Sequence, residues 1–149
     1  MNSMAKQEYY PMPSFSTLAV GDISESTLWY SERLGFAIVF QIPGQGDAAI
    51  LVHLRWAKYA DLLLVPGSET ETQKGVGVTL NFSMGDRSID DFAESLKSND
   101  VSFEGPVNQP WNARELTVTD PDGFRLTFTQ PVNMDLSIDE VTSSIQEGR

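Results

Sequence analysis

The chain of 149 residues contains no cysteine, which excludes disulfide bonds and zinc sites built from thiolates. It also lacks a long apolar run at its start, where MNSMAKQEYYPMPS is too polar for a signal peptide or a membrane span. We therefore expect a cytoplasmic protein with no membrane partner. The hydrophobic content of 40% is nevertheless sufficient for one compact domain with a core.

Basic side chains are scarce, since 10 of them stand against 21 acidic ones and leave a formal net charge of −11. Such a surface repels the phosphates of nucleic acids and anionic membranes, and it attracts cationic partners. The charge therefore predicts no nucleic-acid partner. The alternative interpretation is that it serves solubility alone, as in many acidic bacterial cytoplasmic proteins.

Two β-type runs flank a tight turn in residues 108–128, NQPWNARELTVTDPDGFRLTF. In the first run Leu116 and Val118 alternate with polar residues, and the second run alternates in the same way. Between them lies DPDG, in which proline presets one backbone angle and glycine tolerates a positive one. The stretch predicts a hairpin with one apolar face and one polar face.

The sequence repeats itself once. TLAVGD, a helix and RLGFAIVF in the first half correspond to TLNFSMGD, a helix and SLKSNDVSFEG in the second. Asp22 and Ser88 are the expected N-caps of the two helices, the first of which ends near Leu34 and Gly35. Each half therefore reads as β-α-β-β-β. The expected strands are 14–20, 36–42, 48–56 and 61–65, then 77–84, 101–104 and the two strands of the hairpin.

A half of about 55 residues cannot bury its sheet alone, so the two halves are expected to share a curved mixed sheet. This predicts one α+β domain over residues 14–132, with modules 14–67 and 75–132 joined by a polar linker. Residues 1–13 form an N-terminal arm. The acidic tail 133–149 spaces Ile138, Val141 and Ile145 as in a short amphipathic helix.

The polar face of this sheet is expected to line a cup suited to a small ligand. Trp111, which follows a proline between two strands, offers an aromatic ring there or else closes one end of the barrel. Glu115 could pair with a cationic ligand, accept hydrogen bonds from Arg125, or serve as a general base. The residues assigned to the cup are Phe15, Thr17, Ala19, Thr79, Asn81, Ser83, Glu115, Thr117, Arg125 and Thr127.

With GDISESTLWYSERLGF in the first module and QPWNARELTVTDPDGFRLTF in the second, residues 12–132 resemble the vicinal oxygen chelate superfamily, the glyoxalase/bleomycin resistance fold. The QPW-x-x-RE-x-x-x-x-DPDG segment resembles the bleomycin resistance branch. The resemblance implies a homodimer that sequesters a cationic, partly aromatic small molecule, with the tryptophan at position 111 stacking on the ligand. Asp47 and Ala48 stand where drug-binding relatives place a second ring, which Trp56 or Tyr59 could supply instead.

Enzymes of this superfamily hold a divalent metal at positions that the resemblance matches to Phe15, Thr79 and Thr127 in this chain. None of the three offers a nitrogen or carboxylate ligand, so no metal and no other cofactor is expected. The only histidine, His53, is interpreted as structural, and so are Trp29 and Tyr30 in the first helix. Asp61 is expected at a hairpin tip with its charge in solvent.

The resulting hypothesis is a metal-independent antibiotic-binding protein rather than an enzyme. The alternative is a glyoxalase-like or dioxygenase-like enzyme of the same fold, with an unconventional metal or none. A scaffold protein with a vestigial cup is a third possibility. The candidate ligand-binding residues are Trp111, Glu115, Asn112, Trp56, Tyr59, Asn81 and Arg125.

Overall fold

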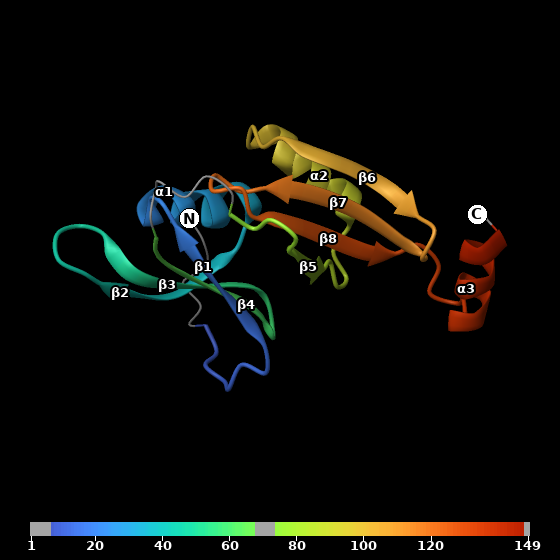
Figure 1. The fold of residues 1–149 in the computed structure, drawn as a ribbon, viewed down its shortest axis with the longest axis horizontal. Helices are drawn as coiled ribbons and strands as arrows, with labels where there is room; N and C mark the ends of the chain where they lie inside the picture. The colour runs from blue at the N-terminus through green and yellow to red at the C-terminus, as the bar shows by residue number, and fades with distance from the viewer. Residues whose placement is uncertain (1–6, 68–73, 148–149) are drawn as a thin grey trace. The chain divides into compact units, whose positions relative to one another are not determined.

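The computed structural model describes residues 7–67 and 74–147. Its elements follow the predicted order, and each module is complete in itself (Figure 1). The first module contains β1 (Phe15–Val20), α1 (Ile23–Leu28), η1 (Trp29–Leu34), β2 (Ala37–Pro43), β3 (Ala49–Ala57) and β4 (Ala60–Pro66). The second contains β5 (Thr79–Ser83), α2 (Ile89–Ser98), β6 (Phe103–Gln109), β7 (Ala113–Thr119) and β8 (Arg125–Pro131), followed by α3 (Ile138–Glu147).

Strand pairing repeats between the modules. The first sheet has the order β1-β4-β3-β2 and the second the order β5-β8-β7-β6. In both, the first strand pairs in parallel with the last, and the remaining pairs are antiparallel. The fold is therefore the α+β arrangement that the repeat predicted. The strands form two four-stranded sheets, one in each module, where the sequence led us to expect one shared sheet, because each module pairs only its own strands.

The chain divides into two compact units that follow these sheets. The first comprises residues 1–74 together with the turn Asp120–Gly123, and the second comprises residues 75–119 and 124–149. The turn between β7 and β8 thus packs within the first unit, although the chain order assigns it to the second module. Within the described residues, no helix has the length and apolar character that crossing a membrane requires.

The helix of the first unit begins and ends as its sequence predicts. The Asp22 carboxylate accepts a hydrogen bond from the amide of Glu25 at 2.9 Å, which caps the N-terminus of α1. After α1 the chain continues as the π-helical segment η1 and ends at Gly35, whose φ of 95° favours glycine. Tyr30 in η1 is fully buried and packs edge-on against Phe36, so its packing role is confirmed.

One face of the first sheet is apolar and packs beneath α1, which contacts β3 and β4. Leu18, Leu54 and Leu64 lie on this face and are almost completely buried. The opposite face, here called the helix-free face, receives the alternate residues of each strand, because side chains alternate along a strand. In this unit it carries Phe15, Thr17, Ala19, His53, Arg55, Asp61 and Leu63.

The second sheet is built in the same way. In Figure 1, α2 lies along one face of β6, β7 and β8, and Ser88 caps its N-terminus through the amide of Asp91. Phe82, Leu116 and Phe128 are buried on this face. The helix-free face of the second sheet carries Thr79, Asn81, Ser83, Glu104, Glu115, Thr117, Thr119, Arg125, Thr127 and Thr129.

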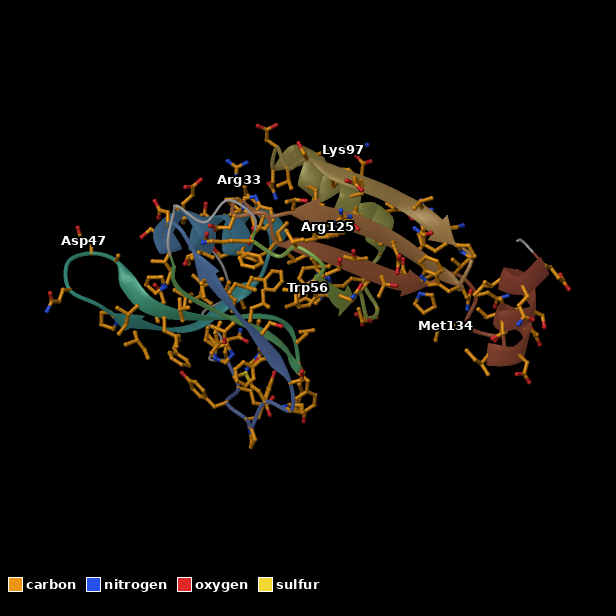
Figure 2. The ribbon with its side chains drawn as sticks, viewed as in Figure 1. Arg33, Asp47, Trp56, Lys97, Arg125 and Met134 are labelled. Carbon is orange, nitrogen blue, oxygen red and sulfur yellow. The ribbon has the colours of Figure 1, made fainter. Side chains whose placement is uncertain are left out.

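The tail forms the predicted amphipathic helix. Ser137 caps α3 by accepting a hydrogen bond from the amide of Glu140 at 3.1 Å. Val141 is buried, whereas Ile138 and Met134 are highly exposed. Figure 1 shows α3 beyond the end of β8, and Figure 2 labels Met134 in the segment that leads to it.

Candidate ligand-binding site

Trp111 and Glu115 come together at one end of the helix-free face of the second sheet. Trp111 lies in the turn between β6 and β7, and Glu115 is the third residue of β7. The indole Nε1–H donates a hydrogen bond to Oε2 of Glu115 at 3.3 Å. The tryptophan side chain is 51% exposed, so a ligand can reach its ring. An aromatic face and a carboxylate side by side form a site that attracts organic cations.

A bulge in β6 determines which residue of that strand lies opposite Glu115. Gly105 has a φ of 95°, and a Cβ atom there would lie 2.6 Å from the carbonyl oxygen of Glu115. Glycine is therefore required at this position, because any side chain would collide with the backbone of β7. The register shift falls between Glu104 and Val107, after which Val107 pairs with Glu115.

Glu115 has no other hydrogen bond or ion pair within residues 7–67 and 74–147. The sequence left open whether Arg125 would be its partner. The register places Arg125 opposite Thr119 and Glu115 opposite Thr129. The Arg125 guanidinium lies instead 3.9 Å from Glu104, and Figure 2 shows it at the start of β8. The Glu115 carboxylate thus keeps free lone pairs for a ligand.

Asn112 shapes the turn that presents Trp111. Its φ of 64° lies in the left-handed region, which asparagine tolerates better than most residues. The side-chain amide donates to the carbonyl of Asn133 at 2.8 Å, and its oxygen accepts from the amide of Asn133 at 2.9 Å. The Asn112 side chain therefore holds the turn to the segment after β8 and so positions Trp111. These two hydrogen bonds occupy both the donor and the acceptor of its amide group.

Hydroxyl groups cover the middle of the same face. Thr117 and Thr127 share a hydrogen bond of 2.7 Å between their Oγ1 atoms, and Thr127 is almost completely buried. Asn81 is exposed and donates to the carbonyl of Thr79 at 3.3 Å. The helix-free face thus carries hydroxyl and amide groups across β5, β8 and β7.

Arg114 points to the other side of β7 from Glu115, because side chains alternate along a strand. Its guanidinium donates to the Asp90 carboxylate on α2 at 2.8 Å and to the side chain of Asn108 at 3.0 Å. The hydrogen bond from Arg114 lowers the pKa of Asp90, and the same bond raises the pKa of Arg114. Arg114 consequently joins the sheet to α2 and lies on the opposite side of β7 from Glu115.

Trp56 and Tyr59 belong to the first unit. Trp56 is only 6% exposed, because it lies on the helix side of β3 and its ring centroid is 5.3 Å from that of Phe36 (labelled in Figure 2). Tyr59 lies at the tip of the β3–β4 hairpin and is 54% exposed. The tip of the other hairpin carries Asp47, exposed and without a ring, as the sequence indicated.

The prediction for Asp61 was wrong. Asp61 is the second residue of β4, one step beyond the hairpin tip, and pairs with Arg55 across the ladder. Its side chain has no exposed surface and accepts hydrogen bonds from Arg55 at 2.9 and 3.1 Å. His53 Nε2 lies 3.0 Å from Oδ2 of Asp61, and the imidazole is buried against Phe40.

Burial alone would raise the pKa of Asp61, but hydrogen bonds from Arg55 and His53 outweigh it and lower the pKa. The bond to Asp61 likewise raises the pKa of Arg55. These three residues form a buried charged cluster on the helix-free face of the first sheet, here called the Asp61 cluster. The signal for it was present in the sequence: HLRWAKYAD places His53, Arg55 and Asp61 on one face of a hairpin.

The residues present do not fit the metal that enzymes of this fold bind. Phe15 has no ligand atom, Thr79 offers only a hydroxyl group, and Thr127 is bonded to Thr117. Asp61 lies opposite Phe15 in the ladder, but its carboxylate is committed to the Asp61 cluster. In the part of the chain that the structure describes, no three His, Cys, Asp or Glu side chains are grouped so that they could hold a metal ion.

Comparison with protein families matches residues 14–128 to the Glyoxalase/Bleomycin resistance protein/Dioxygenase superfamily. A comparison with the curated proteins gives no match. Among solved structures, an integron cassette protein from the mobile metagenome of the Halifax Harbour sewage outfall is 29% identical, with a TM-score of 0.60; the match covers 77% of this chain and 95% of that one.

Two proteins from Streptomyces sp. CB03234 share the fold. A glyoxalase/bleomycin resistance protein is 24% identical, with a TM-score of 0.62 and coverage of 78% of this chain and 97% of that one. TnmS3, an antibiotic binding protein, is 23% identical, with a TM-score of 0.62 and coverage of 84% and 99%. At this level of identity the likeness establishes the fold alone.

Proposed function

Since the chain belongs to the Glyoxalase/Bleomycin resistance protein/Dioxygenase superfamily, we propose that it binds and sequesters a cationic, partly aromatic small molecule without using a metal ion. The observation that carries the proposal is the contact between Trp111 and Glu115, an exposed ring beside a carboxylate with free lone pairs. No bond is made or broken in this function. Protection against the small molecule depends on binding affinity alone. It requires a Kd of about 1 μM or tighter, which corresponds to a binding free energy of about −8 kcal/mol.

Three further properties support this ligand chemistry. A cation over the indole face gains about 0.5–2 kcal/mol, and the adjacent Glu115 adds an opposite charge. The exposed side-chain amide of Asn81 and the half-buried hydroxyl group of Thr117 offer hydrogen bonds to the rest of the ligand. The formal charge of −11 concentrates cations near the protein. In this proposal Asn81 and Arg125 line the site, and Asn112 positions Trp111. Trp56 and Tyr59 belong to the first unit and are not assigned to this site.

The comparison with TnmS3 is consistent with the proposal, because that protein is an antibiotic binding protein of the same fold. We further propose that the protein acts in the cytoplasm as a homodimer. The exposed apolar residues Met134, Leu136 and Ile138 support an association between copies, which sedimentation analysis of the purified protein tests.

Isothermal titration with cationic glycopeptide and aromatic drugs, bleomycin included, tests the binding function. We expect at least one of them to bind with a Kd of about 1 μM or tighter, and Trp111→Ala to weaken it by about 10-fold or more. Trp111→Phe, which keeps an aromatic ring, is the matched control and retains part of the affinity. If no drug binds and the protein turns over a thiol or dicarbonyl substrate, it is an enzyme of the same fold instead.

A further inference from the structure

The segment Glu8–Tyr10 lies across the helix-free face of the first sheet, on top of the Asp61 cluster. Residues 7–14 are not part of any strand, so this segment is held by side chains and not by a strand ladder. Arg55 donates from Nη1 to the carbonyl of Glu8 at 2.6 Å. The ring of Tyr9 lies 6.1 Å from that of Phe40. The segment therefore covers the cluster without becoming part of the sheet.

Tyr10 makes the contacts of a bound ligand. Its ring lies beneath the guanidinium of Arg55, 4.4 Å from ring centroid to Cζ, and 4.8 Å from the ring of Tyr59. Its hydroxyl group donates to both carboxylate oxygens of Asp61 at 3.3 Å. The same oxygen accepts a hydrogen bond from the amide of Tyr59 at 2.7 Å. A flat ring, a donor and an acceptor are thus each matched, which together specify a phenol.

The backbone at the hairpin tip is arranged for this contact. Tyr59 has a φ of 67°, which is uncommon for a bulky side chain. The amide that this conformation presents is the one that binds the Tyr10 hydroxyl group. A strained residue that points a polar group at a partner is typical of ligand sites.

Space for a larger ligand adjoins Tyr10. A pocket of about 320 Å³ is lined by Gln7, Glu8, Tyr10, Arg55, Trp56 and Lys58, among others. Its size falls at the lower end of the range for small-molecule sites. Arg55 belongs to both the pocket lining and the Asp61 cluster, and Tyr10 lines the pocket while contacting the cluster. A ring that replaced Tyr10 would therefore have room for further groups beside it.

We propose that the helix-free face of the first sheet is a second ligand site, for a hydroxyaromatic ring, and that Tyr10 fills it as an intramolecular ligand. A phenolic small molecule enters by displacing Glu8–Tyr10 and takes over the contacts with Arg55, Tyr59 and Asp61. The contacts of this site all lie in the first unit, and none of them involves Trp111. Binding here and binding at Trp111 can therefore be measured, and can fail, independently of each other.

Titration of 4-methylphenol into full-length wild type and into full-length Tyr10→Ala tests the site. This probe reproduces the tyrosine side chain from Cβ outward. A tethered group competes at an effective concentration in the millimolar range, so its removal is expected to tighten binding of the probe by about 10-fold or more. Tyr9→Ala removes the neighbouring ring, which rests on Phe40, and is expected to leave the affinity of the wild type unchanged.

A ligand series separates a phenol site from an apolar hole. Toluene has no hydroxyl group and 4-methylanisole has no donor, so both are expected to bind Tyr10→Ala about 10-fold more weakly than 4-methylphenol, or worse. Equal affinities for the three compounds would overturn the proposal. So would equal affinity of wild type and Tyr10→Ala for 4-methylphenol, or no binding by the variant.

A second measurement keeps the proposal testable if Tyr10→Ala does not fold. Wild-type protein is titrated with the same compounds at millimolar concentration, and the amide resonance of Tyr59 is followed by NMR. The proposal expects this resonance to shift with 4-methylphenol and to remain in place with 4-methylanisole. A Tyr59 amide that responds to neither compound, or equally to both, contradicts it.

Discussion

The first sheet places a carboxylate, Asp61, on its helix-free face, and the second sheet places Glu115 there, but the two carboxylates have different surroundings. Asp61 is fully buried and bonded to Arg55, His53 and Tyr10. Glu115 is half-buried and accepts one hydrogen bond, from Trp111. The same βαβββ topology therefore holds a carboxylate in two ways: fully hydrogen-bonded within the first unit, and with unused acceptor capacity in the second.

Trp56 and Trp111 differ in exposure in the same way as the two carboxylates. Trp56 is on the helix side of β3 and is 6% exposed, whereas Trp111 leaves the sheet at a turn and is 51% exposed. Large side chains that are buried stabilise the fold, and exposed ones next to polar groups are available for recognition. The contrast predicts that substitution of Asp61 or Trp56 changes stability, and that substitution of Trp111 or Glu115 changes affinity for the cationic ligand.

The largest effect is expected from Asp61→Ala. Removing one member of a buried ion pair leaves Arg55 unpaired, which costs about 3–5 kcal/mol in the free energy of unfolding. Asp47→Ala, in the exposed β2–β3 turn of the same unit, is the matched control and should change it by less than about 0.5 kcal/mol. Urea denaturation measures both. Equal effects would show that the Asp61 cluster does not stabilise the first unit.

Trp56→Ala should destabilise nearly as much. It removes a buried ring that packs on Phe36, at a cost of about 3–5 kcal/mol, while Trp111→Ala should cost less than about 1 kcal/mol because half of that side chain is in solvent. Thermal or urea unfolding of the two variants makes the comparison. A Trp111→Ala protein that is as unstable as Trp56→Ala would mean that Trp111 serves the fold.

Acid should destabilise the first unit through Asp61. Because the folded state lowers the pKa of this carboxyl group, its contribution is complete above the unfolded value of about 3.9 and is lost as pH falls through the folded pKa. Urea unfolding of wild type at pH 6, 4 and 3 should therefore show a decline. In Asp61→Asn, which cannot titrate, the decline should be shallower; an identical pH profile would contradict the assignment.

The smallest effect is expected from Glu115→Gln, which removes a charge and retains the shape of the side chain. Affinity for a cationic ligand should fall by a factor of about 2–5, as for a partly exposed ion pair, and the loss should shrink at high salt. Glu104→Gln is the matched control on the same face, since that carboxylate lies 3.9 Å from Arg125. Titration calorimetry at two salt concentrations distinguishes the two variants. A larger loss of affinity in Glu104→Gln would indicate that the ligand lies nearer to Glu104 than to Glu115.

The local patterns in the sequence predicted the elements well. Asp22 and Ser88 cap their helices, Gly35 ends η1, and the alternation in β7 separates Leu116 from Glu115, because each signal depends on neighbouring residues. The repeat of two βαβββ modules, and with it the fold class, followed from these elements.

Long-range contacts were not predictable in the same way. In the first unit Asp120 accepts a hydrogen bond from the buried Tyr30 hydroxyl group at 2.7 Å, and Asp122 accepts bonds from Gly21 and Lys74. Burial, followed by the charge of Asp120, raises the pKa of Tyr30 well above its usual value. The sequence identified these aspartates only as turn formers, because nothing local indicates a partner about 90 or 100 residues away.

The candidate site was predictable in part. Trp111 and Glu115 were selected from a turn and an alternating strand, and the structure places them in contact. The sequence could not determine that Arg125 pairs with Glu104 and not with Glu115, since the bulge at Gly105 and the β7–β8 register decide it. Nor did it reveal the covering of the Asp61 cluster by Tyr10, a contact between residues 51 positions apart.

The most direct test of ligand binding at Trp111 is NMR of the three tryptophan indole N–H resonances during titration with a bleomycin-type or other cationic aromatic drug found to bind. The Trp111 resonance, assigned with Trp111→Phe, should shift progressively and saturate at the Kd from calorimetry. The resonances of Trp29 and Trp56 should stay in place. If Trp56 responds while Trp111 does not, the ligand binds outside the second sheet and the proposed site is wrong.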